Sequence, residues 1–187
     1  MSLDLVIGPM FSGKSSYLLS SIRRYKEIGW STYIITSNLD KRYSNDTKIV
    51  NHNQESCNAD VAVDTLYTVS AHEKFLTAKV VIIEEAQFYP DLIKFVLEAV
   101  EVYEKHVIVA GLDGDASRKP FGSLLQLIPI ADNVVKLKAL CKKCGDGTDA
   151  LFTSYKLLTI HNEDSNISVG GAEKYEALCR KHYLAYN

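Results

Sequence analysis

The chain has 187 residues, of which 47% are hydrophobic and 24% are charged, and its formal net charge is −2. This composition is typical of a globular protein and excludes disorder, collagen and a coiled coil as descriptions of the whole chain. Because domains usually have about 100–200 residues, the length predicts one domain with a small remainder. A duplex nucleic-acid binder usually carries a basic surplus, so we expect no nucleic-acid partner.

The sequence shows neither a transmembrane segment nor the pattern of a signal peptide. No apolar run approaches the length of about 18 residues that indicates a transmembrane helix, so we expect no membrane partner. Asp4 stands where a signal peptide would carry basic residues. The expected compartment is therefore the cytoplasm, or the cytoplasm of a host cell.

Strand and helix signals alternate from the start of the chain. Residues 3–7 form a short apolar run that predicts a buried strand. Residues 14–28 carry apolar side chains at helical spacing, and Gly29 fits the end of that helix. Residues 30–36 are rich in β-branched and aromatic side chains and predict a second strand. Residues 38–58 are polar and lack a period, so we expect a long loop there.

The alternation continues in the middle of the chain. Residues 80–83 are a fully apolar run, typical of a central parallel strand. A helix is predicted from Pro90 to about Glu104, and residues 107–110 predict another buried strand. Strand, helix and strand in alternation predict an α/β fold, with a parallel sheet flanked by helices.

A glycine-rich segment between the first strand and the first helix carries a phosphate-binding pattern, G-x-x-x-x-G-K-[ST]. Backbone N–H groups at a helix N-terminus cradle phosphate oxygens, the lysine reaches the β- and γ-phosphates, and the hydroxyl coordinates Mg²⁺. The pattern arises by chance in about one chain in a hundred at average residue usage, and the surrounding strand and helix favour a true nucleotide site. The predicted nucleotide-binding residues are Gly8, Pro9, Met10, Phe11, Ser12, Gly13, Lys14 and Ser15.

Two acids follow the central strand. Glu84 and Glu85 come directly after residues 80–83, and successive side chains of a strand point to opposite faces. Ligands of open α/β sheets bind at the carboxyl ends of the strands. One carboxylate would hold Mg²⁺ there, and the other could accept a proton from an attacking hydroxyl. The alternative is a solvated charge pair, which the neighbouring phosphate-binding pattern makes less favoured.

Cysteine spacing indicates a metal site in the last part of the chain. Two residues separate Cys141 from Cys144, and two separate Cys179 from His182. Each pair can chelate one tetrahedral ion, and four protein ligands predict a structural Zn²⁺. The alternative is three buried cysteines and an exposed histidine. The predicted division of the chain is a nucleotide-binding unit and a zinc-binding unit, over residues 1–138 and 139–187.

Further motifs occur jointly and in order with these, from about Leu5 to Tyr183. In this combination the chain resembles the cytosolic-type (type II) thymidine kinases. The resemblance implies a P-loop α/β domain with a small C-terminal zinc-binding lasso domain. It also implies transfer of the γ-phosphate of ATP to the 5′-hydroxyl of thymidine or deoxyuridine with Mg²⁺, and a homotetramer that thymidine triphosphate inhibits. The additional motifs are Glu-Ala-Gln-Phe-Tyr-Pro-Asp at 85–91, Arg-Lys-Pro-Phe-Gly at 118–122, Val-Lys-Leu at 135–137 and Val-Gly-Gly-Ala-Glu-Lys-Tyr at 169–175.

The same resemblance implies roles for individual residues. Glu85 falls at the position of the general base, and Glu84 falls at that of the magnesium-linked acid. Lys14, Arg42 and Mg²⁺ would supply positive charge at the transferred phosphoryl group. Asp40 matches a loop near the sugar. The other positions that match the nucleoside pocket surround the deoxyribose and base, receive the thymine methyl or belong to the lasso: Phe88, Leu112 and Phe121; Met10, Thr153 and Tyr175; Val169, Gly170 and Gly171.

Three departures from the family pattern leave an alternative open. Glu84 stands where the family usually has Asp, and Ala116 stands where it often has an aromatic residue. The loop around residues 162–165 is a few residues longer than in many members. The alternative is a catalytically impaired nucleotide-binding relative with a regulatory role. A zinc protein that binds nucleic acid is a further alternative, which the charge of −2 disfavours.

Overall fold

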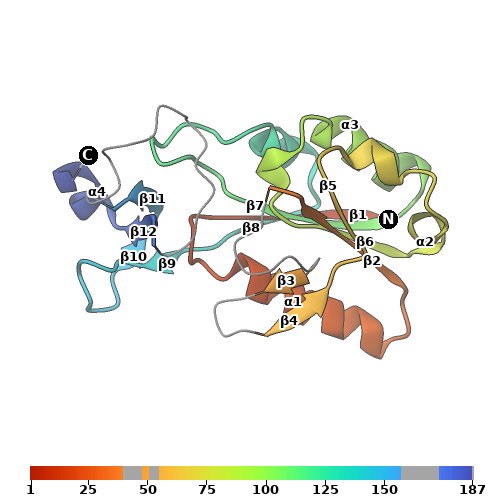
Figure 1. The fold of residues 1–187 in the computed structure, drawn as a ribbon, viewed down its shortest axis with the longest axis horizontal. Helices are drawn as coiled ribbons and strands as arrows, with labels where there is room; N and C mark the ends of the chain where they lie inside the picture. Colours follow the sequence, from red (N-terminus) through yellow and green to blue (C-terminus); the bar gives the residue numbers. More distant parts are fainter. Residues whose placement is uncertain (40–47, 51–54, 157–172, 187) are drawn as a thin grey trace.

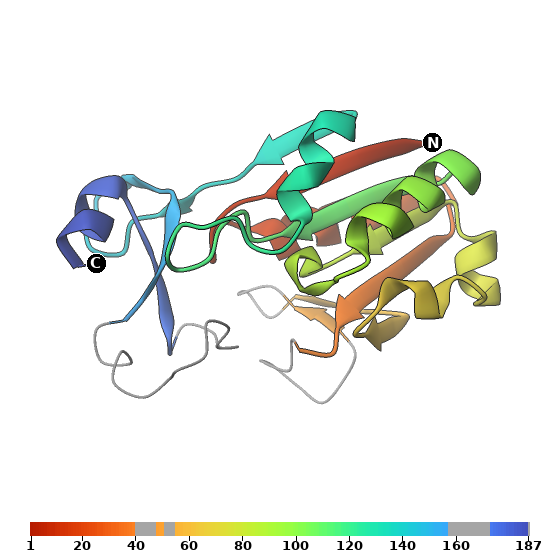
Figure 2. The same cartoon turned by 90° about the horizontal axis from the view of Figure 1, so that it is seen from above.

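The computed structural model describes residues 1–39, 48–50, 55–156 and 173–186. They form a sheet with helices on both faces and a smaller C-terminal unit (Figure 1). Figure 2 shows the C-terminal unit beyond the carboxyl ends of the sheet strands, away from the N-terminus. The predicted lasso lies mostly outside the described residues.

The main sheet has six strands in the order β5-β2-β6-β7-β1-β8, and all of its pairs are parallel. The predicted α/β fold is therefore confirmed, and the four strands predicted from sequence lie side by side at its centre. The sheet strands are β1 (Ser2–Ile7), β2 (Thr32–Ser37), β5 (Val61–Val63), β6 (Val80–Ile83), β7 (His106–Gly111) and β8 (Asn133–Lys136).

Helices cover the two faces of this sheet. The first, α1 (Lys14–Glu27), matches its prediction and lies on one face, and α3 (Leu92–Leu97) lies on the other (Figure 1). The predicted helix up to residue 104 changes character after α3, because residues Glu98–Val102 form a π-helical turn. No helix in the described part of the chain is long and apolar enough to cross a membrane. Shorter helical pieces are η1 (Leu66–Val69), α2 (Glu73–Thr77), η2 (Ala86–Phe88) and η4 (Leu124–Ile130).

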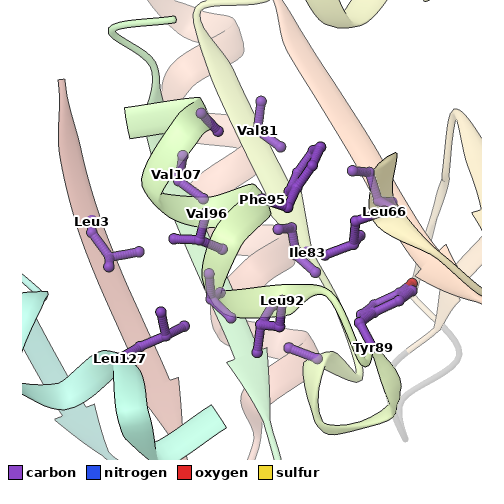
Figure 3. Packing of buried hydrophobic residues seen from close by; sticks show 14 of the residues in the cluster. Leu3, Leu66, Val81, Ile83, Tyr89, Leu92, Phe95, Val96, Val107 and Leu127 are labelled. Atoms are coloured by element: carbon purple, nitrogen blue, oxygen red, sulfur yellow. The ribbon is translucent and has the colours of Figure 1, made fainter. Parts of the chain in front are cut away.

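The core has two layers because successive strand side chains point to opposite faces. In β6, Val81 and Ile83 belong to the cluster under α3, whereas Val80 and Ile82 belong to the cluster under α1. Figure 3 shows the first of these clusters, in which Phe95 and its helical neighbours lie against the sheet. Both faces are thus buried, which explains why the central strands are continuous apolar runs rather than alternating ones.

The segment predicted as a long loop contains a small hairpin. Strands β3 (Lys48–Val50) and β4 (Ser56–Asn58) pair antiparallel, and Ile49 is fully buried in the cluster under α1. Cys57 packs partly against the same cluster. The prediction of a loop across residues 38–58 is therefore wrong for this hairpin, because one buried isoleucine is enough to fix a short strand against the helix.

The described residues of the C-terminal unit form two small antiparallel pairs and one short helix. Strand β9 (Ala139–Leu140) pairs with β10 (Asp149–Ala150), and β11 (Phe152–Tyr155) pairs with β12 (Tyr175–Leu178). Helix α4 (Arg180–Tyr186) follows directly. The small apolar cluster of this unit includes Cys141 and Cys179, so two of the predicted metal ligands are also core residues.

Candidate active site and metal centre

The phosphate-binding segment forms the turn between β1 and α1, as its pattern predicts. Gly13 is the N-cap of α1 and has a φ of 87°, in the left-handed region that glycine adopts without steric cost. Gly8 lies so close to its neighbours that a Cβ there would be 2.5 Å from the Leu137 carbonyl oxygen. The glycines therefore allow a close turn that directs the N-terminus of α1 toward a bound phosphate.

Lys14 lies folded over this turn. Its Nζ donates to the carbonyl oxygen of Pro9 at 2.8 Å and to that of Gly8 at 3.2 Å. These bonds hold the ammonium group beside the loop that would surround the phosphates. A phosphate would replace neutral carbonyls with charged oxygens, which form stronger bonds to a cation.

Glu84 and Ser15 meet at the carboxyl end of β6. Glu84 is 6% exposed, and its Oε1 accepts a hydrogen bond of 2.8 Å from Ser15 Oγ. Thr36 Oγ1 donates to Oε2 at 3.5 Å, from the end of the neighbouring strand β2. Carboxylate and hydroxyl oxygens are the hard ligands that Mg²⁺ prefers, so this pair fits the predicted ion. Glu84 therefore reaches the serine of the phosphate loop directly.

Glu85 has an unusual backbone conformation. Its φ of 49° and ψ of 44° place it in the left-handed region, which costs about 1–2 kcal/mol for a residue with a Cβ. Strain of this kind is maintained only where the surroundings hold it, and it concentrates at functional sites. Gln87 Nε2 donates to Glu85 Oε2 at 2.6 Å. The turn therefore separates the two acids, with Glu84 beside the phosphate loop and Glu85 beside the following 3₁₀ turn.

Tyr89 adds a buried hydroxyl behind the two acids. Burial raises the pKa of this phenol, and the negative charges of Glu84 and Glu85 raise it further. The hydroxyl is therefore neutral at physiological pH.

The predicted nucleoside residues that the structure describes include two sets that make contacts among themselves. The rings of Phe88 and Phe121 make an edge-to-face contact, with centroids 5.5 Å apart and planes at 84°. In the second set, the Met10 backbone N–H donates to Thr153 Oγ1 at 3.0 Å, which joins the phosphate loop to β11. Tyr175 stands opposite Tyr155 in the β11–β12 pair, with ring centroids 4.9 Å apart. The predicted residues outside the described part of the chain are Asp40, Arg42, Val169, Gly170 and Gly171.

The four predicted metal ligands converge in the C-terminal unit. One ligand atom from each of Cys141, Cys144, Cys179 and His182 lies within 4.8 Å of all the others. His182 Nδ1 is 3.4, 3.3 and 3.5 Å from the sulfurs of the three cysteines, in chain order. A tetrahedral zinc ion takes Cys and His ligands of this kind at about 2.0–2.3 Å, so the set fits Zn²⁺.

The thiols of this cluster differ in acidity. Burial raises the pKa of Cys141, but hydrogen bonds from the backbone of Cys179 and Cys144 and from His182 outweigh it and lower the value to about 6. Burial raises the pKa of Cys144 to about 11. A cation among the sulfurs would remove this asymmetry, because a coordinating thiol is deprotonated.

Two contacts near the candidate site were not predicted from the sequence. Tyr183 Oη, on α4, donates to the carbonyl oxygen of Ala116 at 2.6 Å, and the Arg118 guanidinium lies 4.6 Å from the Tyr183 ring centroid. They attach the segment after β7 to the C-terminal unit, and Figure 2 shows this segment reaching toward it. The second is the hydrogen bond from Gln87 to Glu85. The only sequence signal for Gln87 was its place in the Glu-Ala-Gln-Phe motif.

The fold and the site together define a P-loop α/β protein with an appended Cys₃His cluster that could hold a metal ion. A sequence model of the thymidine kinase family matches residues 1–183. The chain therefore belongs to the thymidine kinase family, and it is a kinase. The resemblance stated from its motifs is confirmed.

Individual relatives agree with this assignment. The chain is 35% identical to the thymidine kinase of Myxoma virus (strain Uriarra), over 97% of this chain and 96% of the relative. It is 38% identical to thymidine kinase a of Arabidopsis thaliana, over 98% of this chain and 75% of the relative. The cytosolic thymidine kinase of Homo sapiens is 36% identical over 97% of this chain and 73% of the relative.

Proposed function

We propose that the chain transfers the γ-phosphate of ATP to the 5′-hydroxyl of thymidine, and also accepts deoxyuridine. The observation that carries this proposal is the Ser15–Glu84 hydrogen bond at the phosphate loop, with Glu85 next in sequence at the same sheet edge. Phosphoryl transfer requires little more than positioned phosphates, a metal ion and an oriented nucleophile. The described residues include candidates to bind the phosphates, to hold the metal ion and to orient the nucleophile.

On the phosphate side, the N-terminus of α1 and Lys14 bind the β- and γ-phosphates of ATP. Ser15 and Glu84 hold Mg²⁺, which when bound neutralises charge on the transferred group. Arg42 supplies further positive charge at the same place. Glu85 takes the proton of the 5′-hydroxyl while the 5′-oxygen of the nucleoside forms its bond to the γ-phosphorus. The bond between the γ-phosphorus and the β–γ bridging oxygen breaks, and ADP leaves.

On the nucleoside side, Phe88, Phe121 and Leu112 enclose the deoxyribose and the base. Met10, Thr153 and Tyr175 form a small pocket for the thymine methyl. Asp40 binds near the sugar. The lasso, through the backbone of Val169, Gly170 and Gly171, binds the edge of the base, where an unpaired buried group costs about 1–3 kcal/mol.

The Cys₃His cluster holds one structural Zn²⁺, because four protein ligands leave no open coordination position. When bound, the ion would join His182 of α4 to the cysteines that follow β9 and β12. Residues 1–138 then act as the nucleotide-binding unit, and residues 139–187 as the unit that closes over the nucleoside. A homotetramer, inhibition by thymidine triphosphate and a cytoplasmic location complete the proposal.

The test is direct phosphorylation of thymidine by the purified chain with ATP and Mg²⁺, followed by chromatography of the products. Formation of thymidine 5′-monophosphate supports the proposal, and its absence contradicts it. Binding of ATP without turnover would favour the alternative, a catalytically impaired relative. Against that alternative, Glu84 makes its bond to Ser15, and Ala116 contributes a carbonyl that α4 binds.

A further inference from the structure

Gln87 lies between Glu85, the candidate base, and Leu112, which is predicted to line the nucleoside pocket. It belongs to η2, directly after the two acids, and is only 4% exposed. Its Nε2 donates to Glu85 Oε2 at 2.6 Å, and its Oε1 accepts from the Leu112 backbone N–H at 3.0 Å. One amide therefore joins the segment that follows β6 to the segment that follows β7.

The two partners require an amide in this orientation. A backbone N–H can only donate, so the side-chain oxygen of Gln87 faces Leu112. The NH₂ group then faces Glu85, whose carboxyl oxygen accepts the hydrogen bond. A second carboxylate would repel the first, and a hydrocarbon side chain would leave the N–H of Leu112 without its partner.

Close packing holds the amide in place. A Cβ at Gly111 would lie 2.5 Å from Gln87 Oε1, and a Cβ at Gly122 would lie 2.3 Å from the Gln87 carbonyl oxygen. These glycines flank the segment that carries Leu112 and Phe121. The absence of both side chains allows the glutamine to sit against this segment, so movement of the segment would move the amide as well.

The backbone of Glu85 makes this support necessary. Its left-handed conformation is unfavourable for a residue with a Cβ. Such a conformation persists only where the surrounding structure determines it. The bond from Gln87, two residues further on, is one contact that fixes the carboxylate relative to this turn.

We propose that Gln87 is a positioning residue for phosphoryl transfer. Its amide orients the Glu85 carboxylate toward the acceptor hydroxyl and couples that orientation to the backbone of Leu112, beside the sugar. This inference rests on the proposed function, in which Glu85 accepts the proton of the 5′-hydroxyl. Since a displacement of about 1 Å can cost about 10²-fold in rate, loss of the amide lowers kcat more than it changes binding.

The first test is Gln87→Met, which keeps the length of the side chain and removes both hydrogen bonds. We expect kcat to fall by about 10–100-fold, with KM for thymidine changed by less than about fivefold. Gln126→Met makes the same chemical change at an exposed glutamine and should leave both constants unchanged. A kcat for Gln87→Met within about threefold of wild type overturns the positioning role.

A double-mutant cycle with Glu85→Gln separates this inference from the proposed function. If Gln87 acts through Glu85, Gln87→Met changes kcat by less than about threefold in the Glu85→Gln background. A purely structural role lowers kcat by the same factor in both backgrounds, and that outcome overturns the inference. Wild-type turnover of Glu85→Gln alone would instead show that the proposed role of Glu85 is wrong.

A second variant covers the case in which Gln87→Met fails to fold. Gln87→Glu keeps the shape and the oxygen that accepts from Leu112, but it loses the NH₂ donor. Two facing carboxyl groups either repel each other or hold a proton between them, and both states weaken Glu85 as a proton acceptor. We expect kcat to fall while KM for thymidine stays within about threefold, and an unchanged kcat overturns the proposal.

Discussion

The two units of this chain are stabilised by different means. The sheet unit buries a large apolar cluster on each of its faces. The C-terminal unit has one small cluster, and two of its members, Cys141 and Cys179, are also candidate metal ligands. Fewer than about 50 residues rarely bury a sufficient core, and a structural metal is a common remedy. The candidate catalytic residues of the sheet unit therefore lie at the edge of its sheet, outside the apolar core. In the C-terminal unit, two of the candidate metal ligands belong to the core itself.

Several contacts nevertheless join the units beside the candidate site, and two of them are hydrogen bonds. Thr153 of β11 accepts a hydrogen bond from the phosphate loop, and Tyr183 of α4 donates one to the segment after β7. Loss of the C-terminal fold should therefore disturb the nucleoside side, whereas the sheet should retain its own core. The following changes separate the two units, from the largest expected effect to the smallest.

Removal of the metal should have the largest effect. Binding of a structural zinc ion contributes about 10–16 kcal/mol in small zinc domains, so Cys141→Ser or chelation should unfold the C-terminal unit. We expect phosphorylation of thymidine to be lost while ATP binding, measured by calorimetry, is retained. Cys57→Ser is the matched control, because that cysteine lies outside the cluster. Metal analysis of the wild-type chain should give about one zinc per chain, and finding none would contradict the prediction.

Glu85→Gln should have the next largest effect, and only on turnover. The substitution keeps the shape and removes the basic oxygen, so kcat should fall by about 10²–10⁴-fold. Steady-state kinetics would be compared with ATP affinity, which should stay at the wild-type value. Glu101→Gln, at an exposed glutamate of the sheet unit, should leave kcat unchanged. Turnover within a few-fold of wild type would exclude Glu85 as the base.

Phe95→Ala should destabilise the sheet unit without touching the metal cluster. Phe95 lies on the sheet-facing side of α3 and is 2% exposed, and truncation of a buried phenylalanine costs about 3–5 kcal/mol. Urea denaturation should show this loss in the free energy of unfolding, with the zinc content unchanged. Val102→Ala removes an exposed side chain of the same unit and should cost about 0.5 kcal/mol or less. A loss of zinc in Phe95→Ala would mean that the two units do not fold independently.

Tyr183→Phe should have the smallest effect and should test the link between the units. It removes one hydrogen bond to Ala116 and keeps the ring beside Arg118, which should cost about 0.5–1.5 kcal/mol. We expect KM for thymidine to rise several-fold while kcat at saturation and ATP affinity are retained. Tyr186→Phe, at the end of the same helix, serves as the control. An unchanged KM would show that this bond does not position the residues that line the nucleoside pocket.

Sequence reasoning succeeded where a feature depends on neighbouring residues. The turn before α1, the buried strand at 80–83 and the close approach of the residues in each two-residue spacing are local, so the sequence predicts them without the fold. It failed where distant residues supply the reason. The hairpin at β3 and β4 depends on Ile49 packing under α1, and the π-helical turn after α3 interrupts a helix whose apolar spacing looked regular.

Gln87 shows the same limit inside the candidate site. Its position two residues after Glu85 was visible, but its second partner, Leu112, lies 25 residues away. Only the pairing of β6 with β7 brings the ends of these strands together. The bond between Tyr183 and Ala116 spans 67 residues and had no sequence signal at all.

By itself, the sequence determined the chemical parts of this protein: a phosphate loop before a helix, two acids after a buried strand, and two metal-binding pairs. Each part is specified by spacing along a few residues, because a turn or a chelate has a short, fixed geometry. The tertiary structure alone decided which parts meet. Ser15 reaches Glu84 because β7 lies between β1 and β6 in the sheet, and the two metal pairs converge because β9, β10 and β12 pack together. Strand order depends on burial across the whole chain, which no local pattern contains.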